Sequence, residues 1–185
     1  MKKSLLVALL LVLSISLLAC SSGDSDLVKV ADSRKGKSAG FQIDGSEKSY
    51  RKLPEMLNKA DLIVLGKVVK QDDFGDFSVM TEVKVSRTIK GPNYEVVGII
   101  QLKDGYELAI GEEYLLALAS QQPLYEADYY ALCGSRQGAF RQSGIGIEVY
   151  ADTFLSEIQR IVAKGQKESL SLSELADWFE TIIGK

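Results

Sequence analysis

The chain has 185 residues, with 25 acidic and 22 basic side chains and no histidine. Its net charge of −3 disfavours nucleic acid and anionic membrane surfaces as partners, because both attract clustered lysine and arginine. The absence of histidine excludes Ser-His-Asp triads, Cys-His pairs and HExxH zinc sites, so we expect no enzyme of these classes, no metal and no cofactor.

The beginning of the chain has the features of an export signal. Two lysines precede a sixteen-residue, mostly apolar stretch over 4–19, which is short for a membrane-spanning helix of about 20 residues. At its end, Leu17-Leu18-Ala19-Cys20 resembles the lipobox of bacterial lipoprotein precursors. The resemblance implies cleavage after Ala19, a diacylglycerol group on the sulfur of Cys20 and palmitoylation of its new amino group.

Lipidation of Cys20 bears on location, disulfides and charge. We expect an exported protein held at a bacterial membrane, and the family's sorting rule implies the outer membrane in a diderm host because Ser21 follows the cysteine. Cys133 is left without an intrachain partner, so no internal disulfide is expected and a buried, inert thiol is favoured. Loss of residues 1–19 removes two lysines and changes the net charge from −3 to −5.

The composition of the segment after the export signal predicts a tether. Residues 20–49 combine the lipidated cysteine with a stretch rich in serine, glycine, aspartate and lysine, which favours a flexible linker. Within it, ADSRKGKS at 31–38 matches the loosest phosphate-loop pattern, but it lacks the strand and helix that a nucleotide site requires. We expect no nucleotide there. Residues 50–185 have a normal length for one globular domain.

Residue patterning predicts the elements of this domain in chain order. A short helix over 50–60 precedes strands at 62–70, 78–91, 94–102 and 113–119, then further strands or one bent hairpin over 127–142. Two helices follow, of which the first ends at Gly165 and the second is capped by Ser173. The order favours an α+β fold, a small antiparallel OB-like Greek-key β-barrel with one N-terminal and two C-terminal helices.

One acidic segment raises the question of a calcium site. DDFGDF, Asp72 to Phe77, holds three carboxylates around a glycine. Counted from Asp72, Phe74 occupies the third position and Val83 the twelfth, where a calcium-binding loop needs oxygen ligands. We therefore expect a solvated hairpin turn and no metal site.

Three segments resemble a known barrel. KADLIVLGKVVK (59–70), TEVKVSRTIKGP (81–92) and IGEEYLLALAS (110–120) are similar to the OB-fold modules of tissue inhibitors of metalloproteinases and netrin-type proteins. The resemblance implies the barrel and not a function. Those inhibitors place a free amino-terminal cysteine in the protease site, whereas an acylated Cys20 on a tether is expected here, so their mechanism does not transfer.

One group of residue types suggests a binding surface, because tyrosine and arginine are enriched at binding hot spots. The candidate patch consists of Tyr125, Tyr129, Tyr130, Arg136 and Arg141. Neighbouring residues of a strand point to opposite faces, so one of Tyr129 and Tyr130 is expected in the core. Ordinary packing and surface roles for these residues remain the alternative.

These features favour a non-enzymatic, lipid-anchored module of the cell envelope that binds or assembles with a protein or peptide. Two alternatives stay open. An enzyme acting on envelope glycan would need Glu82, Glu113 or Glu126 to converge to about 5–9 Å. A small-ligand carrier would need a large apolar cavity inside the barrel.

Replacement of Cys20 tests the anchor. We expect Cys20→Ser to release the protein from the membrane, because each buried CH₂ of an acyl chain contributes about 0.8 kcal/mol and two chains suffice for durable attachment. Envelope fractionation of the variant beside the wild type measures the effect. A variant that stays as fully membrane-bound as the wild type would show that lipid on Cys20 does not hold the protein.

Overall fold

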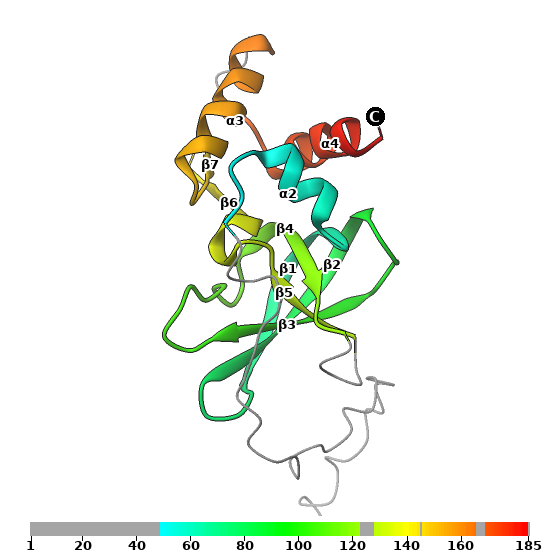
Figure 1. The fold of residues 1–185 in the computed structure, drawn as a ribbon, viewed down its shortest axis with the longest axis vertical. Helices are drawn as coiled ribbons and strands as arrows, with labels where there is room; N and C mark the ends of the chain where they lie inside the picture. Colours follow the sequence, from blue (N-terminus) through cyan, green and yellow to red (C-terminus); the bar gives the residue numbers. More distant parts are fainter. Residues whose placement is uncertain (1–48, 123–127, 145, 166–168, 185) are drawn as a thin grey trace, which may run out of the picture. The chain divides into compact units, whose positions relative to one another are not determined.

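Five strands close into a small β-barrel in the computed structural model, which describes residues 49–122, 128–144, 146–165 and 169–184 (Figure 1). The strands are β1 (Leu62–Asp73), β2 (Ser78–Lys90), β3 (Val96–Leu102), β4 (Glu113–Ser120) and β5 (Tyr129–Leu132). Their order is β1-β2-β3-β5-β4, and β4 pairs back with β1. The pairings are antiparallel except that of β3 with β5. The predicted α+β fold with an OB-like barrel is confirmed, and the parallel pair makes the barrel mixed.

Two short strands extend the sheet beyond the barrel. β6 (Ala139–Ser143) pairs with β4, and β7 (Gly146–Glu148) pairs with β6. A 3₁₀ helix, Ser135–Gly138, connects β5 to β6, and a Cβ atom on Gly138 would lie 2.5 Å from the carbonyl oxygen of Ala117. Because β5 and β6 both pair with β4, the region over 127–142 forms separate strands rather than one bent hairpin.

The hairpin of β1 and β2 contains the acidic segment. β1 runs to Asp73, and the backbone N–H of Phe74 donates to the carbonyl oxygen of Ser78 at 2.8 Å, so the predicted hairpin turn is confirmed. The strand register shifts beside Gly66. A Cβ atom on Gly66 would lie 2.7 Å from the carbonyl oxygen of Lys84, so the glycine allows β2 to cross β1 closely.

Alternation along the strands divides the buried side chains between two cores. The barrel core includes Leu62, Val64 and Ile99. The second core joins Ile63 and Leu65, which alternate with them on β1, to the three helices. Both faces of β1 are therefore buried, which explains why its first residues form an uninterrupted apolar run.

The helices are α2 (Leu53–Lys59), α3 (Asp152–Lys164) and α4 (Leu172–Ile183), and Figure 1 shows them grouped at one end of the barrel. α4 contacts β1, β2, β4 and β6, α2 contacts β4, and α3 packs against α2. Phe179 of α4 packs edge-on against Phe140 of β6, with ring centroids 5.3 Å apart. Within the described ranges, every helix is too short or too polar to cross a membrane.

The start of α4 corrects one prediction. Ser173 was expected to cap this helix, but the cap is Ser171. The hydroxyl of Ser171 accepts from the backbone N–H of Glu174 at 3.2 Å, and the backbone N–H of Ser171 donates to the Glu174 carboxylate at 2.9 Å. Ser171 caps the helix instead of Ser173 because a glutamate, Glu174, lies three residues after it and completes this reciprocal capping box.

The connection from β3 to β4 closes one end of the barrel. Leu108 of this connection is buried in the barrel core. The side-chain amide of Gln71 donates to the Leu108 carbonyl at 2.6 Å, and that of Gln101 donates to the Tyr106 carbonyl at 2.9 Å. Thr81 donates to Gln101 at 2.8 Å, so polar side chains of three strands hold the connection in place.

Truncation of Leu108 measures how much this closure contributes. We expect Leu108→Ala to lower the free energy of unfolding by about 2–5 kcal/mol, because it removes buried methyl groups and leaves a cavity. Leu102→Ala, at a half-exposed leucine of β3, is the matched control and should change it by no more than about 0.5 kcal/mol. Denaturant titration of both variants gives the two values. Equal effects would contradict a closing role for Leu108.

Candidate functional site

The structure separates the residues of the candidate patch. Tyr125 lies outside the described residues. Tyr129 and Tyr130 point to opposite faces of β5, and Tyr130 is the member in the barrel core, as alternation predicts. Arg136 and Arg141 belong to a different surface from Tyr129, because they converge on Tyr150 and Glu148. The tyrosines and arginines therefore do not form one site.

Tyr130 belongs to a small polar group at the start of β5. Its hydroxyl lies 3.2 Å from that of Tyr94, which contacts the Asp128 carboxylate at 3.4 Å. The side chain of Gln122 also donates to Asp128. Burial, and then the hydrogen bond with Tyr94, raises the pKa of Tyr130, so it stays a neutral phenol. This group joins β5 to the β2–β3 connection through Tyr94 and to the β4–β5 connection through Gln122 and Asp128.

Tyr129 contributes to an apolar surface outside the barrel. Its ring packs edge-on against Phe74 in the β1–β2 turn, with centroids 5.6 Å apart. Gly98 of β3 makes room for this arrangement, because a Cβ atom there would lie 3.3 Å from the Tyr129 ring and 3.2 Å from the sulfur of Met80. The side chains of Phe74 in the turn, Met80 on β2 and Tyr129 on β5 therefore lie close together around Gly98 of β3.

Two exposed residues extend this surface to the tip of the hairpin. Phe77 is 70% exposed and Leu102 is 48% exposed. The two residues lie on adjacent chain segments, because the backbone N–H of Lys103 donates to the Phe77 carbonyl at 3.0 Å and Leu102 lies opposite Ser78. We call the set formed by Phe74, Phe77, Met80, Leu102 and Tyr129 the aromatic hairpin surface. Large apolar side chains left in solvent together are characteristic of interaction sites.

The two arginines take part in a hydrogen-bonded cluster around Glu148. Arg141 donates to one carboxylate oxygen of Glu148 through Nε at 2.9 Å and Nη2 at 2.6 Å. The Tyr150 hydroxyl donates to the other oxygen at 2.8 Å. The guanidinium of Arg136 lies 5.7 Å from the centre of the Tyr150 ring, and the Tyr106 ring lies 4.6 Å from it on centroids. The cluster fastens β6 and β7 to the β3–β4 connection.

The sequence did not single out Glu148 and Tyr150. The feature that identifies Glu148 is the register of the β6–β7 pair, in which Arg141 lies directly opposite Glu148. Cross-strand pairs of opposite charge stabilise sheets. A three-residue strand is too short for its alternation to be recognised before its partner is known.

Cys133, Glu82 and Glu113 are the titratable groups of the described residues that bear on catalysis. Burial raises the pKa of the Cys133 thiol to about 12, so it is protonated at neutral pH and a poor nucleophile. No three potential metal ligands gather among the described residues. Glu82 lies opposite Lys70 and Glu113 opposite Lys67, on the two strands that flank β1. Strand spacing and rise put their Cα atoms about 14 Å apart.

Comparisons with known proteins assign no family to this arrangement. No protein-family model matches the chain, and no curated protein sequence matches it significantly. Function is therefore inferred from the chain's own residues and geometry.

Neutralisation of Glu148 tests the cluster. Hydrogen bonds from Tyr150 and then Arg141 lower the pKa of this carboxyl group from 4.5. A lowered pKa means that the charged form stabilises the fold above about pH 4.5, and that this stabilisation is lost as the pH falls through the folded-state value. We expect Glu148→Gln to be less stable than the wild type at pH 7, with a difference that shrinks below pH 4.5.

Urea titrations of both proteins between pH 7 and pH 3 measure this difference. Glu107→Gln, at an exposed carboxylate of the β3–β4 connection, is the control and should leave the pH profile unchanged. A constant difference for Glu148→Gln across the range would contradict the role of its charge.

Proposed function

We propose that the chain is an envelope lipoprotein, anchored through lipid on Cys20, whose barrel domain binds a protein or peptide and catalyses no reaction. The lipobox resemblance and the tether composition support the anchor and the export. In a diderm host, Ser21 favours the outer membrane. The partner would be met at the membrane surface, within reach of the tether.

The aromatic hairpin surface is the observation that carries the binding role. Phe77 and Leu102 remain in solvent although the domain has two cores able to bury apolar side chains. Met80, Leu102 and Tyr129 of this surface lie on paired strands, and such preorganisation lowers the entropy cost of association. OB-type barrels use the same region, the face of the second and third strands with its loops, for their ligands.

The two alternatives receive less support. Glu82 and Glu113 lie on different strands, separated by β1, farther apart than paired-carboxylate catalysis requires, and Glu126 is outside the described residues. The barrel interior is filled by side chains, with Leu108 packed into the end, so a carrier would have to displace its own core. A ligand on the outside of the barrel requires no such change.

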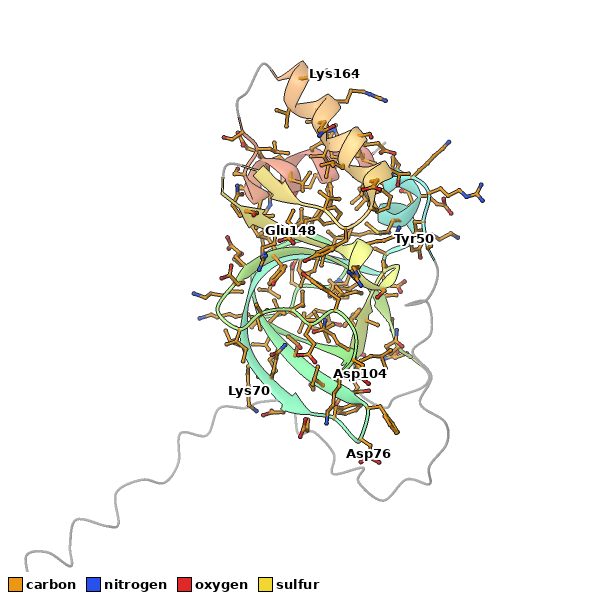
Figure 2. The ribbon with its side chains drawn as sticks, turned by 90° about the vertical axis from the view of Figure 1, so that its left-hand side faces the viewer. Tyr50, Lys70, Asp76, Asp104, Glu148 and Lys164 are labelled. Carbon is orange, nitrogen blue, oxygen red and sulfur yellow. The ribbon has the colours of Figure 1, made fainter. Side chains whose placement is uncertain are left out.

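Photocross-linking in living cells tests the proposal. A photoreactive amino acid at position 76, in the hairpin turn, should capture a partner protein, whereas one at position 164, at the end of α3, should not. Figure 2 shows Asp76 and Lys164 far from each other on the domain. Gel shifts after irradiation of the full-length lipoprotein give the readout.

The matched variant is Phe77→Ser with the cross-linker kept at position 76. We expect its adduct to fall at least severalfold, because central aromatic side chains carry much of the energy of an interface. Equal adducts at positions 76 and 164, or none at position 76, would overturn the hairpin as the binding surface.

A further inference from the structure

Negative charge is concentrated around the aromatic hairpin surface. The two segments 67–84 and 101–113, which form the hairpin and the β3–β4 connection with its flanks, contain eight acidic and four basic side chains. Figure 2 shows Asp76 and Asp104 at the same end of the barrel. An excess of one sign over a small surface raises the local concentration of oppositely charged partners.

The lysines closest to the hairpin tip are already paired. Lys70 forms an ion pair with Asp72 and lies 3.7 Å from Glu82. Lys103 lies 2.9 Å from Asp73. Among the described residues, Asp76 and Asp104 have no such cation within ion-pair distance. Their carboxylates remain available to a positively charged ligand.

Apolar exposure coincides with this charge. Six large hydrophobic side chains are exposed in the described ranges, and four of them lie here: Val69, Phe77, Leu102 and Ile110. Val69 and Ile110 flank the hairpin, where the backbone N–H of Gly111 donates to the carbonyl of Val68 at 2.9 Å. The end of the barrel therefore offers apolar contact area beside acidic groups, which is a combination that an amphipathic ligand matches.

We propose that the occupant of the aromatic hairpin surface is a basic, amphipathic segment of a partner protein. Its apolar side chains contact Phe77 and Leu102, and its lysine or arginine side chains pair with Asp76 and Asp104. Complementary charge of this kind sets specificity and association rate. This inference rests on the proposed function and specifies the chemistry of the partner.

The same charges argue against a lipid surface as the occupant. An exposed phenylalanine at a hairpin tip could insert into a bilayer. Anionic lipids, however, attract lysine and arginine and repel carboxylates such as Asp76 and Asp104. The hairpin is therefore suited to a basic protein segment and not to an anionic membrane.

Peptide binding to the mature, full-length lipoprotein in phosphatidylcholine nanodiscs tests the inference. The probes are two labelled twelve-residue peptides of alternating leucine with lysine or leucine with glutamate, measured by fluorescence anisotropy against empty nanodiscs. We expect the lysine peptide to bind more tightly than the glutamate peptide. The double variant Asp76→Asn, Asp104→Asn should weaken binding of the lysine peptide about threefold to tenfold, which is the effect expected for the loss of two exposed charge pairs. It should also reduce the salt dependence of that binding.

Two further variants sharpen the result. Phe77→Ser with Leu102→Ser should weaken both peptides, whereas Glu157→Gln on α3 should leave binding unchanged. Equal binding of the two peptides, an unaffected double asparagine variant, or protection of the hairpin from hydrogen exchange by anionic nanodiscs would each overturn the inference. The cross-link at position 76 reports the proposed function separately, because it captures a partner of any charge.

Discussion

β1 pairs with β2 along one edge and with β4 along the other, and this double pairing closes the barrel. The same strand sends Leu62 and Val64 into the barrel core and Ile63 and Leu65 towards the helices. The two cores are therefore coupled through one backbone. A change of register by one residue would exchange their side chains, so the apolar run of β1 is the constraint on which barrel closure and helix packing both depend.

The candidate surface follows from where that double pairing ends. β4 pairs with β1 only as far as Lys67, whereas β1 continues with β2 to Asp73. The hairpin thus extends past the closed part of the barrel and carries its turn into solvent (Figure 1). Gln71 and Gln101 hold the β3–β4 connection against its base. Phe77 and Leu102 are consequently exposed on a support whose strands are fixed by the barrel.

Local patterning was sufficient for most of the fold and for little of the site. Period-two and helical spacing located the barrel strands, β6 and the helices, because each pattern spans one element, whereas the three-residue strand β7 was missed. The parallel contact of β3 with β5 involves residues about thirty positions apart, and no local pattern encodes it. For the same reason, Tyr129 and Arg141 looked like one patch in the sequence, although pairing carries Tyr129 towards Phe74 and Arg141 towards Glu148.

Charge and anchoring combine into one physical argument about the partner. An acidic domain gains nothing from an anionic bilayer, so a protein of this composition needs a hydrophobic anchor to stay at a membrane, as lipid on Cys20 would provide. Repulsion from lipid headgroups would in turn keep the acidic hairpin accessible. In the proposed complex, Asp76 and Asp104 would act over about one Debye length, about 8 Å at physiological salt, and would attract a basic segment before Phe77 made contact.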